Sequence, residues 1–561
     1  MPSRTITSLA LLALLVVAGF WWRAVWVTRH LLRVDAPAAI ADKSGNVYQV
    51  AVGRVRFNPV RRRVTVDTIH VSTNDSVNAL RPRPRSALRL SFQHCTMSGV
   101  RVFKLTFRRG LNAETFGCAA VTAAVDVPRG APDSTAPSDD AERAFFVLQQ
   151  SLRLPASTPQ VRVARIDFPQ VALDFRLERA QGEARLQLEH LRWLMTDFLI
   201  DPRDSTAAAR PLFSDTVEIA AANFVGQLDS VTAVTVAALR LSLSDSTLEV
   251  RGVAFAPSQT DAAFARSHPY RRTLIRTATS RIDVRGLDVG VFLLRQGVRA
   301  RRVQLDSLRL DVFSDLRRPR DRRRPTRRTP QAWIAGIERE IHVDSVVIRD
   351  GEIVYREQRP RHNKPGVMTF GRLEAVATNV RHVTGGGRRS TRTPLTLNTT
   401  AYLQNEGKLE ARFVVPLDTP RFTMAFRGRL GPMPATSLNA FIDEALPLRL
   451  DKGRIESITF SATVTNGVAR GTVTPRYKDL AVEVTGEGST GILGAGGVIG
   501  GAARGVATLV GNLTELRSDN PEDGATAARA GTIHHTFRSD ETLPAFLWKS
   551  LRGGLLAVVR K

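Results

Sequence analysis

Carboxylates and histidines are the residue types of this chain that could do chemistry, so their spacing is the first test for an enzyme. Carboxylates such as Asp306, Asp311, Asp344 and Asp350 could hydrolyse a glycosidic bond if two of them lay about 5–10 Å apart. They occur at turn-like positions, where aspartate is common because its side chain bonds to nearby backbone. We therefore expect structural roles for most of them.

The motifs of common catalytic and metal sites do not occur in the sequence. It has no His-Glu-x-x-His zinc motif, no Gly-x-Ser-x-Gly nucleophile elbow and no Walker-type phosphate loop. The adjacent pair His534-His535 is expected on a surface, because successive residues of a strand point to opposite faces. We predict a protein that is not an enzyme and that has neither a metal site nor a cofactor.

The two cysteines, Cys95 and Cys118, are the only ones in 561 residues. Two cysteines are too few for a disulfide-dense scaffold or a multi-cysteine metal site. They could form one bridge in an oxidising compartment, or they could be two separate small apolar residues. The sequence leaves both readings open.

The formal net charge of +27 suits an anionic partner, either nucleic acid or the headgroups of anionic lipids. Residues 317–329 hold eight arginines and two prolines, and no core can be built from such a segment. We therefore predict a solvated Arg-rich loop over 316–330. A contact with lipid headgroups and a plain charged loop tip are both open, whereas nucleic acid is disfavoured because only charge supports it.

An apolar run near the N-terminus predicts a membrane anchor over residues 1–33. About 20 apolar residues cross a hydrocarbon core of about 30 Å as a helix, and an Ala-x-Ala triplet at 39–41 lies too far beyond the run for signal cleavage. Tryptophans end the run, where an aromatic belt is found. The expected anchor residues are Leu9, Leu11, Leu12, Leu14, Leu15, Val16, Val17, Phe20, Trp21 and Trp22.

From residue 45 onwards, alternating apolar and polar residues predict strands with one apolar face. In segments such as 64–71, 166–173 and 303–310, two alternating stretches are separated by two turn-like residues. This shift of phase predicts a tight turn or a β-bulge. Asp350-Gly351, between two such stretches, predicts a hairpin.

A larger duplication is suggested by two short amphipathic helices, expected over 141–152 and 331–340, each before a pair of strands. We divide the rest of the chain into a first β-repeat region (45–315), the Arg-rich loop, a second β-repeat region (331–485) and a C-terminal region (486–561). The C-terminal region holds a Gly-rich segment and an amphipathic segment, 543–559. The latter predicts a helix that lies either on a membrane surface or over the sheet.

Several of these segments resemble the AsmA-like envelope proteins, relatives of AsmA and TamB. The resemblance is carried by 298–315, 341–357, 409–430 and 467–484, and by the closing segments 516–521 and 543–559. It implies a mainly β fold, in which an N-terminal transmembrane helix leads into an elongated, twisted, repetitive β-sheet groove with a few short helices.

The resemblance also implies a single-pass inner-membrane protein with its body in the periplasm. Arg23, Arg29 and Arg33 follow the apolar run, and by the positive-inside rule alone they would keep the body cytoplasmic. Long domains can cross regardless of such charges, so the flanking residues leave the topology open.

The implied function is that of a periplasmic lipid-binding or lipid-transfer protein that contributes to outer-membrane lipid homeostasis. Its partners would be the inner membrane and a phospholipid or another acyl lipid, whose tails fill a concave apolar face at about 0.8 kcal/mol per CH₂. The alternative is a scaffold for outer-membrane protein biogenesis that binds other envelope proteins. The expected groove residues are Val303, Leu305, Leu308, Leu310, Val312, Leu409, Phe413, Val415, Phe422, Met424 and Phe426.

Overall fold

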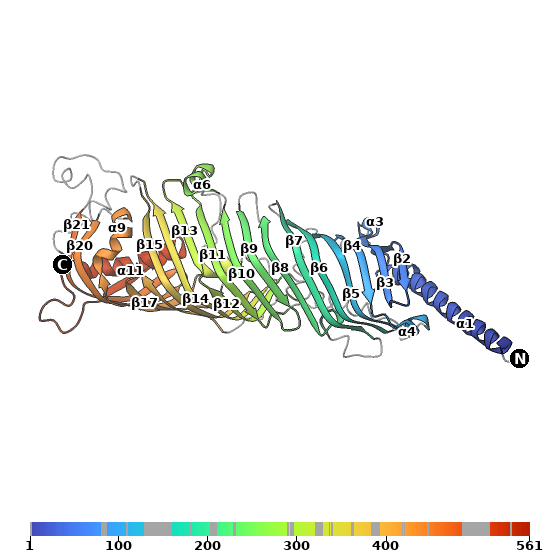
Figure 1. Cartoon of the computed structure of the whole chain (residues 1–561). Coiled ribbons are helices and arrows are strands. Elements are labelled where there is room, and N and C mark those ends of the chain that lie inside the picture. Colours follow the sequence, from blue (N-terminus) through green and yellow to red (C-terminus); the bar gives the residue numbers. More distant parts are fainter. Residues whose placement is uncertain are drawn as a thin grey trace. The chain divides into compact units, whose positions relative to one another are not determined.

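The chain is mainly β, as expected, and its described residues form 22 strands of one hydrogen-bonded sheet (Figure 1). It divides into two compact units, Met1–Val253 with Arg285–Arg295 and Ala254–Val284 with Gln296–Lys561. The structure is a computed structural model that describes residues 3–79, 87–107, 110–127, 160–179, 182–201, 210–227, 232–257, 259–288, 291, 297–319, 329–335, 337, 340–360, 364–382, 393–417, 419, 421–445, 448–484, 516–538 and 541–560.

A long helix, α1 (Ser3–His30), forms over the segment expected to be an anchor, and a π-helical turn (Leu31–Asp35) joins it to α2 (Ala36–Lys43). Of the expected anchor residues, those up to Val16 have side chains outside the described part of the chain. Among the helices that the structure describes, none is both long and apolar enough to cross a membrane.

The N-terminal unit is a run of strands in which each pairs with its neighbour in the sequence, except that β1 and β2 both pair with β3. β5 and β6 are parallel, and the other assigned pairs of this unit are antiparallel. The strands are β1 (Tyr48–Val52), β2 (Val55–Asn58), β3 (Arg63–Thr73), β4 (Ala87–Ser98), β5 (Gly110–Val127), β6 (Gln160–Arg179), β7 (Gly182–Ile200), β8 (Thr216–Gln227) and β9 (Thr232–Ser242), with the short helices α3 (Asp75–Ala79), α4 (Val102–Thr106) and η3 (Pro211–Phe213).

The long strands of this unit bend where two successive residues turn away from the apolar face. In β6, Ile166 and Phe168 are buried before the exposed pair 169–170, and Val171 is buried directly after it. The ladder with β7 shifts its register at this point. Equivalent pairs in the neighbouring strands are 67–68, 93–94, 119–120, 189–190 and 222–223.

The strands continue through these pairs, so the tight turn is wrong here, and a register shift of the kind that a β-bulge produces is present in the ladder between β6 and β7. His94 and Asn223 have φ angles of 50° and 51°, a left-handed conformation that bulges and turns require. A bulge bends its strand, and the two outward residues leave the apolar residues of both halves on the same side. The apolar residues of both halves of these strands therefore lie on one face of the sheet.

Strands of the C-terminal unit are bent in a similar way. Asp350-Gly351 lies inside β14 (Ile341–Gln358), where Asp350 has a φ of 49° and the ladder with β15 shifts on both sides of Gly351. The expected hairpin is therefore wrong, because the chain continues as one bent strand. β12 (Val298–Asp306) and β13 (Arg309–Asp315) both pair in parallel with β14, so they are two halves of another bent strand.

The other strands of this unit are β11 (Thr273–Arg285), β15 (Gly366–His382), β16 (Leu395–Leu403), β17 (Gly407–Val415), β18 (Met424–Leu430), β19 (Met433–Pro434), β20 (Leu448–Thr465), β21 (Val468–Val484) and β22 (Gly531–Thr536); β10 (Thr247–Pro257) crosses the boundary between the units. The helices are α6 (Asp261–Ser267), α8 (Pro330–Ala335), η4 (Ala435–Leu438), α9 (Asn439–Ala445) and α11 (Leu543–Val559).

The expected duplication has a counterpart in the strand pairing. β6 and β14 begin about 180 residues apart, and each pairs in parallel with the strand before it and antiparallel with the strand after it. α8 (Pro330–Ala335) overlaps the first half of the helix expected over 331–340. The helix expected over 141–152, the Gly-rich segment 489–511 and most of the Arg-rich loop lie outside the described residues.

The apolar face of the C-terminal strands is covered by α11. Phe546 and Val558 are buried on one stripe of this helix, and Phe546 packs among residues of β18 and β20–β22. The backbones meet closely, because a side chain at Gly531 of β22 would collide with the backbone of Gly554. Segment 543–559 is therefore the helix that lies over the sheet, one of the two alternatives that the sequence left open.

A buried carboxylate ties α11 to β22. Glu541 is 2% exposed and accepts hydrogen bonds from Lys549 Nζ at 2.6 Å and from His535 Nε2 at 3.0 Å. Burial acts to raise the pKa of Glu541, but the bonds from Lys549 and His535 outweigh it and hold the pKa below its ordinary value. His535 is thus half-buried and engaged, whereas only His534 lies exposed as expected.

Truncation of the central contact of α11 is expected to destabilise the C-terminal unit. Phe546→Ala should lower its free energy of unfolding by about 3–5 kcal/mol, because a fully buried aromatic side chain is lost and a cavity remains. Urea unfolding of the full chain, followed by fluorescence, measures this change. Phe103→Ala removes a phenylalanine that is 63% exposed and serves as the control. Equal midpoints for the two variants would contradict the packing described here.

Candidate functional site

A row of five apolar residues crosses the N-terminal unit from β3 to β7. Val71 lies directly opposite Leu90, and Leu90 lies opposite Ala123. Ala123 pairs in turn with Leu173 in the parallel ladder, and Leu173 pairs with Leu188. Residues directly opposite each other on neighbouring strands point to the same face of a sheet. The five residues, called the apolar row below, therefore lie side by side on one face.

A hollow of about 570 Å³ lies over these strands. Three successive residues of each of the five strands line it, and the middle one is always a member of the apolar row. Its volume is within the range of about 300–1,000 Å³ found for ligand pockets. The lining residues are those at 70–72, 89–91, 122–124, 172–174 and 187–189.

Beside the hollow, towards the line of bends, aromatic rings and a disulfide fill the apolar face. The ring of Phe168 lies 5.8 Å from that of Phe92 and 5.7 Å from that of Phe116. Cys95 and Cys118, directly opposite each other on β4 and β5, are buried and joined in a disulfide. The bridge thus exists, which answers the question that the sequence left open. It crosslinks two strands that line the hollow.

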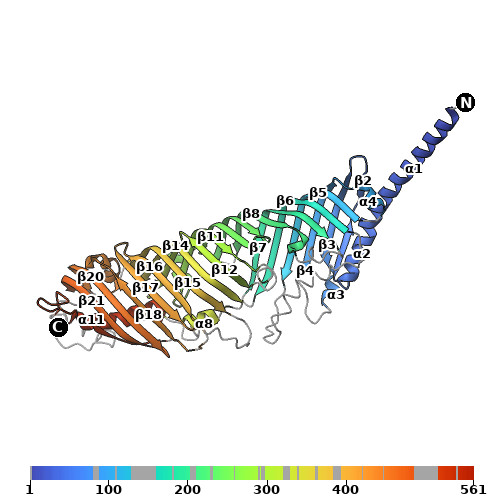
Figure 2. The same cartoon turned by 90° about the horizontal axis from the view of Figure 1, so that it is seen from below.

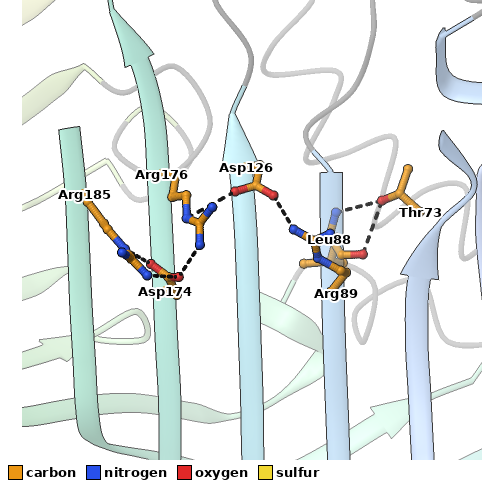
Figure 3. A network of polar contacts seen from close by, with 7 residues as sticks. All are labelled: Thr73, Leu88, Arg89, Asp126, Asp174, Arg176 and Arg185. Carbon is orange, nitrogen blue, oxygen red and sulfur yellow. Dashed lines mark hydrogen bonds and ion pairs between the residues drawn. The ribbon is translucent and has the colours of Figure 1, made fainter. Parts of the chain in front are cut away.

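An alternating network of arginines and aspartates lies on the reverse side of the same strands (Figure 3). Asp126 of β5 accepts from Arg89 at 2.7 Å and lies 3.9 Å from Arg176. Asp174 of β6 accepts from Arg176 at 3.1 Å and from both Nε and Nη2 of Arg185, at 2.8 and 2.7 Å. Since Asp174 follows Leu173 in one strand, the network faces away from the apolar row.

Electrostatics hold this network in its ionised form. The hydrogen bonds from Arg185 are the main reason that the pKa of Asp174 falls from 3.8 to about 2, against the opposing effect of burial. The side chain of Arg89 is 61% exposed and therefore remains accessible from solvent.

The expected groove residues separate into three groups. Val415, Phe422, Met424 and Phe426 are buried in the core beneath α11, and Phe413 packs against them. Leu409 instead packs against a second core around Leu430 and Met433. The protein's own side chains fill the apolar face in both cores, and in the first core α11 occupies the place that a ligand would take.

The remaining expected residues lie on or between β12 and β13 and are half-buried: Val303, Leu305, Leu308, Leu310 and Val312. Val312 pairs with Ile275, which is 44% exposed, so part of this face is open to solvent. These residues belong to neither of the two cores described above, and the structure does not bring them together with the first group.

Of the carboxylates considered at the outset, Asp306, Asp311 and Asp344 have side-chain partners. Asp311 accepts two hydrogen bonds from Arg356, at 2.7 and 2.8 Å, and Arg356 also binds Asp261 at the start of α6. This cluster fixes α6 on β13 and β14. In the part of the chain that the structure describes, no three His, Cys, Asp or Glu side chains are placed to share a metal ion.

Sequence reasoning missed the apolar row, although a signal for it was present. Val71 and Leu173 end two of the stretches in which the shift of phase was recognised. The expected groove residues lie on strands with phenylalanine and methionine, and such large side chains fill the apolar face of a sheet themselves. Small residues such as Ala123 mark the place where it stays hollow.

A scan against models of known protein families and a search of curated proteins find no match for this chain.

Loss of Arg185 is expected to raise the pKa of Asp174. Arg185→Gln should raise the pKa of Asp174 from about 2 towards its ordinary value of 3.8, which carboxyl ¹³C NMR can follow. The pKa of Asp174 is lower in the folded chain than in the unfolded chain. The pair of Asp174 and Arg185 therefore stabilises the fold above pH 3.8, and this contribution is lost as the pH falls towards 2. Arg192→Gln, which removes a partner of Asp167 instead, is the matched control. An unchanged pKa in Arg185→Gln would refute the assignment.

Proposed function

We propose that this chain is an envelope protein that binds the acyl chains of a lipid on the apolar face of its N-terminal unit and passes them between membranes. The hollow over the apolar row carries the proposal. Its lining has the apolar row in the middle and polar neighbours, among them Arg89, Asp174 and Glu189, on either side, and it has the size of a ligand pocket. Burial of each CH₂ of an acyl chain there would contribute about 0.8 kcal/mol.

Arg89 would serve the headgroup. It borders the hollow through its place in β4 beside Leu90, whereas its guanidinium lies on the reverse side of the sheet, where it is bound to Asp126 and is 61% exposed. A lipid phosphate at the edge of the sheet could accept a charge-assisted hydrogen bond from this guanidinium. Binding of the tails on the apolar face and of the headgroup at the solvent-exposed edge needs no chemical step, in keeping with the prediction that the protein is not an enzyme.

The proposed location is the inner membrane, with the body in the periplasm. Three features support it: the apolar run at residues 6–22 in α1, the resemblance to AsmA-like proteins and the disulfide between Cys95 and Cys118. Disulfides persist in oxidising compartments such as the periplasm and are rare in the cytosol. Residues 6–22 are proposed to anchor the chain, with phospholipid and the inner membrane as its partners.

Two alanines of β5 provide the test. Ala123 belongs to the apolar row, whereas Ala119 is exposed in the outward-facing pair 119–120 and lies outside the lining of the hollow. Each is replaced in turn by the photo-crosslinking residue p-benzoylphenylalanine in the full chain, which is expressed in cells with an envelope and irradiated. Mass spectrometry of the purified adducts is expected to find an acyl lipid on the Ala123 variant and several-fold less on the Ala119 variant.

The outcomes separate the proposed function from its alternative. Protein adducts without lipid at position 123 would favour the assembly scaffold. Equal lipid adducts at both positions would mean nonspecific contact with a membrane and would contradict binding in the hollow. Far-UV circular dichroism of both variants checks that the added ring has not unfolded the sheet.

A further inference from the structure

The short helix α4 exposes two aromatic side chains at one end of the N-terminal unit. Phe103 is 63% exposed, and Phe107, directly after the helix, is 47% exposed. Their rings lie 4.8 Å apart, and each also contacts the ring of Phe20 in α1, at 6.0 and 6.2 Å. Adjoining apolar side chains left in water mark a surface that a partner covers.

The outer side of α1, which faces away from Phe20, carries two further exposed aromatic side chains at a similar level along the helix. Trp22 is 72% exposed and Trp26 is 49% exposed, whereas Ala24, Val27 and Thr28 are buried on the opposite side of the helix. Figures 1 and 2 both place α4 beside α1, and the two helices are in contact. The exposed tryptophans of α1 and the phenylalanines of α4 thus belong to the same end of the unit.

A third segment adds an apolar side chain and positive charge. Val60, in the turn between β2 and β3, is 81% exposed, and Arg61 beside it is also exposed. The turn is held next to the segment that leads into α4, because Arg62 donates to the carbonyl of Gly99 at 3.1 Å and accepts from Val100 N at 3.0 Å.

We propose that α4, the turn at Val60 and the exposed tryptophans of α1 form a membrane-docking surface that lies at the level of the lipid headgroups. A bilayer is the occupant that fits, because tryptophan, phenylalanine and arginine together are typical of membrane interfaces and because the apolar run of α1 ends in this surface. This inference rests on the proposed anchoring of α1 and adds a second contact. α4 connects β4 to β5, so docking would fix one end of two strands that line the hollow at their other end.

Site-specific fluorescence quenching tests the contact. Phe103→Cys in the full chain is labelled with bimane, and the protein is reconstituted into vesicles of phosphatidylcholine and phosphatidylglycerol. Lipids that carry a nitroxide at the headgroup are expected to quench this label several-fold more than the same label at Trp333→Cys. Trp333 is the matched control, because it is an aromatic residue on a short helix of the other unit and is 66% exposed.

Flotation of the labelled protein with the vesicles tests the proposed anchoring separately from the docking surface. If the chain does not float, both the anchoring and the docking surface are refuted. If it floats but the label at 103 is quenched no more than the label at 333, the docking surface is refuted and the proposed anchoring stands. Repetition with Phe107→Cys ensures that the result does not depend on a single substitution.

Discussion

The constraint on which this structure depends is the pair of outward-facing residues in the middle of each long strand. In a regular strand successive side chains alternate between faces, so a long apolar face stays open and flat. Two successive outward residues shift the alternation by one and bend the strand, and neighbouring strands do this at nearby positions. The apolar residues of both halves then share the inner side, and such an enclosed face must be covered by something.

The two units cover this face in different ways. The C-terminal unit uses its own chain, because α11 places Phe546 among the buried residues of β18 and β20–β22 and is fixed by the buried Glu541. In the N-terminal unit, phenylalanines and a disulfide fill the face near the bends, and the row from Val71 to Leu188 keeps a hollow. The difference lies in side-chain size and in the presence of a covering helix. A hydrocarbon ligand would do in the first unit what α11 does in the second.

Sequence reasoning gave the fold class, the strands and the recurring shift of phase, because alternation is a local signal. It did not distinguish a bend from a hairpin at Asp350-Gly351, since both place a residue with positive φ between two apolar stretches. Nor could it place the site. Whether Phe426 lines a groove or fills a core depends on α11, which lies more than a hundred residues away in the chain and packs beside it. The partnership of Cys95 and Cys118 likewise depends on strand register, which spacing alone does not give.

Native mass spectrometry of the full chain, purified from expressing cells in mild detergent, shows whether an acyl lipid occupies the hollow of the N-terminal unit. The wild-type protein should retain an acyl lipid, and Leu173→Glu, which places a charge in the middle of the apolar row, should lose it. Phe426→Leu, within the core beneath α11, should keep the lipid. A wild-type protein that is free of lipid, or a Leu173→Glu variant that retains as much lipid as the wild type, would contradict the account.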